Sequence, residues 1–161
     1  KKVNAISGFK IGIVWRGNPS HIRDEERSAD ISLFTELKET EGVSLISLQK
    51  GVDEKIIQKD LELLQIPQIG NNFLEIAQTI KNLDLVITVD TAIAHLAGAM
   101  CVPVWTLIPA YPDWRWGILG DKTIWYPTMK LFRQNKRGCW QEVFQKINEE
   151  LLIIKNQRGV I

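Results

Sequence analysis

Asp90, Thr91 and His95 are the residues whose types and spacing most clearly offer chemistry. Thr91 and Ala92 open a run of small residues that predicts a helix, and the free N–H groups at a helix start attract anions, above all phosphate. His95 follows Thr91 by four residues, so both project from one helix face, where an imidazole N–H can reach a phosphate or sugar oxygen. The alternatives are a plain N-cap role for Asp90 and a hydrogen-bonded core position for His95.

A second polar corner follows the apolar run 9–15. Arg16 comes directly after this run, and its planar guanidinium suits bidentate binding of phosphate. Gly17 permits unusual backbone angles and Asn18 precedes a proline, which together indicate a turn that leads to Ser20. The alternative for Arg16 is an ion pair with an acidic residue of the same loop, namely Asp24, Glu25 or Glu26.

Two apolar strands must position the first corner. The runs 85–89 and 102–107 flank the small-residue helix at 92–100, so the three segments predict a βαβ unit and a parallel sheet. Continuous rather than alternating apolar residues indicate a sheet covered on both faces. Asp90 therefore lies at the carboxyl end of a buried strand, where open α/β sheets bind their ligands.

The rest of the chain alternates in the same way and predicts an α/β fold, a Rossmann-like doubly wound parallel sheet. Further strands are expected at 9–15, 43–48 and 129–133, with a loop or very short third strand at 66–70. Further helices are expected after a cap at Ser32, at 53–64, after a cap at Asn71 or Asn72, and at 140–152. In chain order, the strands at 9–15 and 85–89 are the first and the fourth. A doubly wound sheet places these two strands side by side, so the corners at Arg16 and Asp90 should face one crevice.

Composition excludes several classes of function. The 161 residues suit one domain with a sizeable core, and a net charge of +1 leaves no basic face for nucleic acid. Cys101 and Cys139 are far apart in no metal-binding spacing, so we expect reduced cytosolic thiols, with Cys101 a small core residue. The glycine fingerprint G-x-G-x-x-G is absent, as are a P-loop lysine motif and a serine or cysteine triad, which disfavours a dinucleotide oxidoreductase.

The uncharged stretch 85–110 is not expected to span a membrane, because its period changes from strand to helix. Three residues also interrupt it: Asp90, His95 and Pro103. No signal peptide opens the chain. The chain starts without a methionine and almost directly in a strand, so we expect 1–161 to be a single domain cut from a longer cytoplasmic protein, with 156–161 as a frayed tail.

Four aromatic residues follow the βαβ unit, where two closely spaced prolines exclude regular structure. We expect these aromatic side chains to shape a sugar or base pocket, or else to pack in the core or between domains. Exposed tryptophans here would instead form a partner surface. The four residues are Trp114, Trp116, Trp125 and Tyr126.

These motifs together resemble glycosyltransferase family nine, the ADP-heptose:lipopolysaccharide heptosyltransferases. Residues 89–99, followed by Pro103, are similar to its D-[ST]-[GA]-x-x-H-L-A signature. The fuller set resembles the C-terminal region of bacterial tetratricopeptide-repeat proteins that end in such a domain. It comprises residues 15–21, 27–28, 47–51, 112–116 and 125–134.

The resemblance implies one half of a GT-B fold, in which two Rossmann-like domains face each other across a cleft. This chain would be the C-terminal, donor-binding half of a bacterial, inverting and metal-independent enzyme that needs no cofactor and takes a nucleotide-diphosphate sugar as its donor. The implied donor-site residues are Arg16, Gly17, Asn18, Ser20, Asp90, Thr91, Ala92 and His95, with weaker nucleotide contacts from Gln49 and Lys50. Two departures argue against heptose: Ala92 replaces a common glycine, and Arg16 replaces small hydroxyl residues.

The resemblance places the acceptor site and the general base in an N-terminal half, so no catalytic residue is expected in this chain. We expect the isolated chain to bind nucleotide weakly and to transfer no sugar alone. Its partners in cis would be that acceptor domain and tetratricopeptide repeats. The alternative function is a noncatalytic interaction module of a repeat-containing scaffold protein, in which the crevice would be filled by its own side chains.

Overall fold

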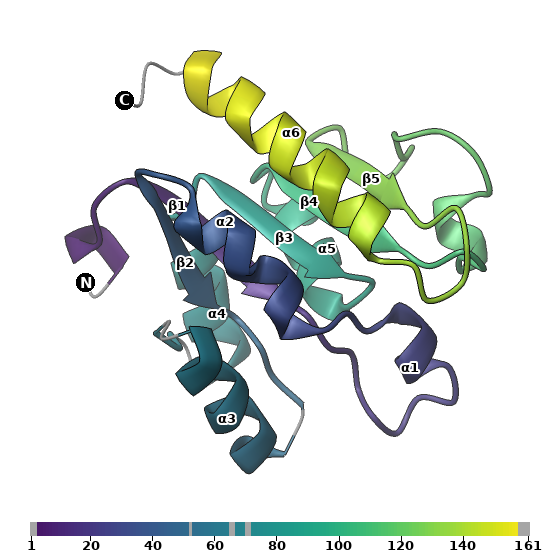
Figure 1. Ribbon diagram of the computed structural model, residues 1–161, viewed down its shortest axis with the longest axis horizontal. Coiled ribbons are helices and arrows are strands. Elements are labelled where there is room, and N and C mark those ends of the chain that lie inside the picture. Colours follow the sequence, from purple (N-terminus) through teal and green to yellow (C-terminus); the bar gives the residue numbers. More distant parts are fainter. Residues whose placement is uncertain (1–2, 52, 65–66, 70–71, 158–161) are drawn as a thin grey trace.

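Five parallel strands form one sheet in the order β2-β1-β3-β4-β5 (Figure 1). The computed structural model describes residues 3–51, 53–64, 67–69 and 72–157. The strands are β1 (Phe9–Val14), β2 (Val43–Ser47), β3 (Leu85–Val89), β4 (Val104–Ile108) and β5 (Met129–Arg133). The helices are η1 (Val3–Ala5), α1 (Asp24–Arg27), η2 (Ile31–Phe34), α2 (Thr35–Glu39), α3 (Glu54–Leu64), α4 (Phe73–Ile80), α5 (Ala92–Ala99), η3 (Trp114–Trp116) and α6 (Gln141–Gln157).

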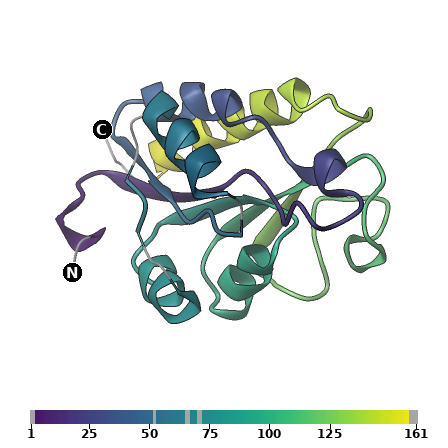
Figure 2. The same ribbon diagram turned by 90° about the horizontal axis from the view of Figure 1, so that it is seen from below.

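Helices cover both faces of the sheet, as the continuous apolar strands predict. Figure 2 shows α2, α3 and α6 on one face and α4 and α5 on the other. Every residue of β3 and β4 is buried. Their side chains contribute alternately to two apolar clusters, one under α2, α3 and α6 and the other under α4 and α5. The α/β doubly wound architecture is therefore confirmed.

β1 and β3 lie side by side, which confirms the predicted neighbours. Ile11 pairs with Leu85 and Val14 pairs with Thr88 in a parallel register. The next strand along the chain from β1, β2, lies on the other side of β1, so the strand order reverses between β1 and β3. The expected third strand is reduced to one parallel bridge between Gln68 and Ser47; residues 66 and 70 of that range lie outside the described residues.

Helix caps follow the predicted chemistry with two differences. Asn72 caps α4 by accepting a hydrogen bond from the Glu75 N–H. Thr91, not Asp90, caps α5, because its hydroxyl accepts from the Ile93 N–H. Asp30 replaces Ser32 as the cap of η2, because this helix begins at Ile31, two residues earlier than a cap at Ser32 implies.

One expectation about the end of an element is wrong. Cys101 is exposed rather than a core residue, because α5 ends at Ala99 and a left-handed turn with φ 56° at Cys101 comes before β4. The helix α6 continues to Gln157 and so includes residues 156 and 157 of the expected tail. Lys155 secures this end by donating to the carbonyl of Glu41. Residues 158–161 lie outside the described part.

The stretch 85–110 forms β3, α5 and β4 rather than one long helix. Among the helices in the described ranges, none has the length and apolar composition needed to cross a membrane.

Candidate functional site

A cleft of about 330 Å³ opens at the point where the strand order reverses, and we call it the switch-point cleft. Loops from four separate parts of the chain meet there, after β1, after β2, before α4 and after β3. Both views show the loops that follow β1 and β3 at the same end of the molecule (Figures 1 and 2). The lining residues are Val14, Arg16, Gly17, Asn18, Arg27, Lys50, Gly51, Asn72, Phe73, Ile76, Thr91, Ala92 and Ile93.

Two helices begin at this cleft. The first residues of α4 and α5 are Phe73 and Ala92, and both line the cleft. The amides of these residues have no carbonyl partner within their own helix, and each helix carries partial positive charge at its start. The cleft therefore offers two converging N-termini to an anion.

Cationic side chains reinforce this charge. Arg16, Arg27 and Lys50 line the cleft, and no carboxylate is among its described lining residues. Arg16 contacts Asp60 through Nε at 3.2 Å, and Asp60 also accepts from the indole of Trp15 at 2.8 Å. This pairing differs from all three partners considered from the sequence. No described side chain is hydrogen-bonded to the two Nη groups of Arg16.

Arg27 links the two polar corners, a role that the sequence did not single out. Its Nε donates to Asp24 at 2.9 Å, and its Nη1 donates to the Asp90 carbonyl at 3.0 Å. Asp24 in turn accepts from the Ser28 hydroxyl, which accepts from the Gly17 N–H at 3.1 Å. The loop after β1 is thus tied to the carboxyl end of β3. The one signal in the sequence was the motif resemblance at 27–28.

Gly17 allows this network to close. A Cβ at this position would lie 2.0 Å from an Asp24 oxygen and 2.5 Å from the Arg27 guanidinium. Any side chain would therefore push the Asp24–Arg27 ion pair away from the loop. The glycine is needed for close approach.

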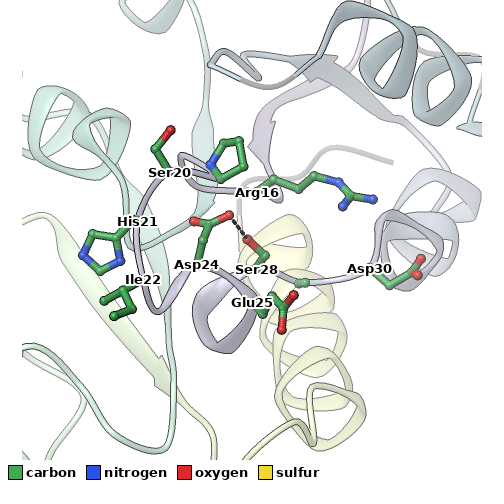
Figure 3. A pocket seen from close by; sticks show the side chains of 10 residues that line it. Arg16, Ser20, His21, Ile22, Asp24, Glu25, Ser28 and Asp30 are labelled. Carbon is green, nitrogen blue, oxygen red and sulfur yellow. Dashed lines mark hydrogen bonds between the residues drawn. The ribbon is translucent and has the colours of Figure 1, made fainter.

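Ser20 faces a different space from its predicted neighbours. It lines a larger outer cleft of about 690 Å³ beside Arg16, Asp24 and Asp30. Figure 3 shows Ser20 at one side of this outer cleft and the Arg16 side chain directed away from Ser20. Arg16 borders both clefts, whereas Ser20 does not line the switch-point cleft.

Gln49 acts as a structural clamp between two loops at the switch-point cleft. It is fully buried, and its Oε1 accepts from the N–H groups of Trp15 and Arg16 at 3.1 and 2.9 Å. Its Nε2 donates to the carbonyls of Arg16 and Lys50 at 3.0 and 2.9 Å. All four hydrogen-bonding positions of this side chain are occupied by protein groups, and its nucleotide contact stays a prediction. Gln49 thereby holds Arg16 and Lys50 in place.

Asp90 lies beside the switch-point cleft, in a cavity of about 60 Å³ that we call the Asp90 cavity. It is 8% exposed. Arg27 lines both spaces, and Asp113, Arg115 and Tyr111 line the far side of the Asp90 cavity. Three carboxylates (Glu26, Asp90 and Asp113) and three guanidinium groups (Arg23, Arg27 and Arg115) line this small space, which forms a suitable environment for hydroxyl groups.

His95 packs in an aromatic cluster and does not line the switch-point cleft. Its ring stacks on Trp116 with centroids 5.1 Å apart, and its Nδ1 is 3.0 Å from the Tyr126 hydroxyl. Gly98 allows Tyr126 to approach, since a Cβ there would lie 2.4 Å from the phenol ring. His95 is therefore half-buried and hydrogen-bonded within this cluster. Arg16 borders the switch-point cleft and the outer cleft, and His95 is not among the described lining residues of either.

Burial is the main influence on His95. It lowers the pKa of the imidazole, an effect opposed by Asp90, reinforced by Arg115 and opposed by Asp113. The folded state therefore favours neutral His95 at pH 7. A neutral imidazole that accepts the Tyr126 proton at Nδ1 carries its own proton on Nε2.

A pH-dependence of stability follows. A histidine with a lowered folded-state pKa stabilises the fold above its ordinary value of 6.5, and this contribution is lost as pH falls through the folded-state pKa. We expect urea denaturation to show a greater loss of stability between pH 7.5 and 5.5 in the wild type than in His95→Gln, by up to about 1.4 kcal/mol per pH unit. The exposed His21→Gln variant is the control and should behave as the wild type. Parallel pH profiles for His95→Gln and wild type would contradict the prediction.

The chain belongs to glycosyltransferase family 9. Residues 26–143 match the family model described as glycosyltransferase family 9 (heptosyltransferase). Among curated proteins, Protein FlbA of Caulobacter vibrioides is 25% identical over 148 residues, which are 87% of this chain and 24% of FlbA.

Solved structures with the same fold include two heptosyltransferases. The E. coli heptosyltransferase WaaC with ADP-2-deoxy-2-fluoro heptose has a TM-score of 0.64 and 15% identity, over 90% of this chain and 44% of that one. The E. coli ADP-heptose LPS heptosyltransferase II has a TM-score of 0.61 and 17% identity, over 94% of this chain and 48% of that one. The C-terminal domain of the glycosyl transferase group 1 family protein LpcC from Francisella tularensis has a TM-score of 0.56 and 17% identity. The match covers 99% of this chain and 82% of that one.

The chain therefore has the fold of one half of a GT-B glycosyltransferase. It spans about a quarter of FlbA and less than half of either E. coli enzyme.

Proposed function

We propose that this chain is the donor-binding half of a glycosyltransferase and holds the diphosphate of a nucleotide sugar in the switch-point cleft. One observation carries the proposal. The N-termini of α4 and α5 and the cations Arg16, Arg27 and Lys50 converge on one open cleft with no carboxylate among its described lining residues. Such an arrangement binds phosphate, and the apolar wall of Phe73 and Ile76 suits a nucleobase. The open cleft also disfavours the scaffold alternative.

The residues of this half would act on the leaving group. In an inverting transfer, the acceptor oxygen attacks the anomeric carbon of the sugar while the bond from that carbon to the diphosphate oxygen breaks. Negative charge grows on the departing diphosphate, where helix N–H groups and guanidinium groups stabilise it without a metal ion. Removal of the acceptor proton needs a general base, which we assign to the rest of the full-length protein.

Titration calorimetry with ADP, UDP and GDP tests the donor site. Arg16→Ala should weaken the preferred nucleotide by about 5- to 30-fold, the effect of about 1–2 kcal/mol from a lost charge-assisted hydrogen bond. The Asp60 contact already satisfies part of the Arg16 charge, so a larger loss is not expected.

Lys146→Ala is the matched control, because this residue is an exposed cation on α6 outside the cleft. It should bind nucleotide as the wild type does. Equal affinity of Arg16→Ala and wild type, or binding of none of the three nucleotides, would overturn the assignment of the cleft.

A further inference from the structure

The segment between β4 and β5, residues 109–128, presents two exposed indoles at fixed positions. Trp114 and Trp125 are 76% and 48% exposed, and their rings meet edge to face with centroids 6.5 Å apart. Figure 1 shows this segment, in green, projecting beyond the carboxyl ends of β4 and β5 at the end of the molecule that also carries α1. Exposed aromatic groups that gather in this way usually mark a binding surface.

A hydrogen bond holds the Trp125 indole, and a capped turn with a cation–π contact positions Trp114. The Trp125 Nε1 donates to the Arg115 carbonyl at 2.9 Å. Asp113 caps the short helix that carries Trp114 by accepting from the Arg115 N–H at 3.0 Å. The Arg115 guanidinium lies 5.9 Å from the centre of the Trp114 ring and 3.4 Å from the Asp113 carboxylate. The two rings are therefore positioned by the same polar pair.

Arg133, the last residue of β5, holds the segment through hydrogen bonds to its backbone carbonyls. It donates to the carbonyls of Trp116, Gly117 and Gly120 at 2.5, 3.0 and 2.6 Å. Ordering an aromatic side chain costs conformational entropy. For an exposed side chain, this cost is not offset by the burial of apolar surface. Such an arrangement is preorganised for a ligand, because the ordering is complete before binding.

We propose that Trp114 and Trp125 form a platform for a pyranose ring, a carbohydrate site separate from the switch-point cleft, in which one indole face stacks on the sugar and the other ring, inclined by 81°, forms a side wall. The C–H face of a pyranose is apolar and matches an indole face, while its rim of hydroxyls both donates and accepts hydrogen bonds. Arg115 donates and Asp113 accepts beside the Trp114 ring, which supplies both kinds of partner.

The location connects this platform to the proposed function. Asp113 and Arg115 also line the Asp90 cavity, which shares Arg27 with the switch-point cleft. A saccharide on the platform would therefore lie on the far side of the Asp90 cavity from the proposed diphosphate site. A role of this site in sugar transfer rests on the proposed function. The binding of a saccharide to the platform does not depend on it.

The competing occupant is an apolar protein surface, because three aliphatic side chains of the segment are also exposed. They are Ile118, Leu119 and Ile124. A protein partner would use these residues as much as the indoles. A pyranose ring needs the flat indole faces, so variants separate the two occupants.

The experiment follows the indole N–H signals of the six tryptophans in ¹H–¹⁵N spectra during titration with methyl glycosides of glucose, galactose, mannose and N-acetylglucosamine. We expect saturable shifts of the Trp114 and Trp125 signals with at least one glycoside, and no shift of the buried Trp15 and Trp105 signals. Trp114→Leu keeps an apolar side chain but removes the ring face, and it should weaken binding at least fivefold. The matched variant Leu119→Ala should bind as the wild type does.

Absence of shifts with all four glycosides would overturn the platform, as would equal losses in Trp114→Leu and Leu119→Ala, which indicate an apolar docking surface. ADP titrated alone should leave the Trp114 and Trp125 signals in place. ADP affinity, measured on the same variants, should be unchanged. Failure of the wild type to bind nucleotide overturns the proposed function, while failure to bind glycosides overturns only the platform.

Discussion

Gln49→Leu is expected to lower the free energy of unfolding by about 4 kcal/mol. The change removes four hydrogen bonds between the end of β2 and the backbone at Trp15, Arg16 and Lys50. Leucine has a similar size, so the cost comes from the backbone groups that lose their partners. Each orphaned buried group costs about 1–3 kcal/mol. Urea denaturation of both proteins measures the difference.

Gln58→Leu is the control for this prediction. Gln58 is exposed on α3 and bonds only to Glu62 among the described residues. Its replacement should change stability by no more than about 0.5 kcal/mol. A loss below about 1 kcal/mol for Gln49→Leu would show that the clamp contributes little, and Arg16 would then be positioned by other contacts.

Ala92→Glu is expected to abolish nucleotide binding while leaving the fold intact. Ala92 is an exposed first residue of α5 and lines the switch-point cleft. A carboxylate about 5 Å from a phosphate costs about 3 kcal/mol at an effective dielectric constant of about 20, which weakens binding more than 100-fold. The same carboxylate at a helix N-terminus stabilises the helix by about 0.3–1 kcal/mol. Calorimetry with ADP and urea denaturation measure the two effects separately.

Ala99→Glu places the same charge at the other end of the same helix. Ala99 is exposed and is the last residue of α5, so this variant should bind nucleotide as the wild type does and lose a little stability. If Ala92→Glu and Ala99→Glu bound ADP equally well, the start of α5 would not contact the ligand, and the proposed diphosphate site would be wrong.

Local pattern accounts for most of the fold. Residues 85–89 and 104–108 are strands because continuous β-branched and aliphatic residues suit a sheet that is covered on both faces. Asn72 caps α4 because a short polar side chain satisfies a free amide at a helix start. The adjacency of β1 and β3 followed from the alternation of strands and helices alone. The errors at Ser32 and Cys101 arose at element ends, where neighbouring turns compete within one or two residues.

The sequence by itself determined the layers, the reversal of strand order and the two polar corners that face one cleft. Only the tertiary structure decided what each polar side chain does there. Arg16 contacts Asp60, which is 44 residues away, Gln49 holds the amide of Arg16 across 33 residues, and Arg27 reaches the Asp90 carbonyl across 63. Strand and helix periods define which face a residue occupies, but they do not define its long-range partner. That choice depends on the directions in which side chains leave the packed strand ends, and these directions exist only once the sheet has formed.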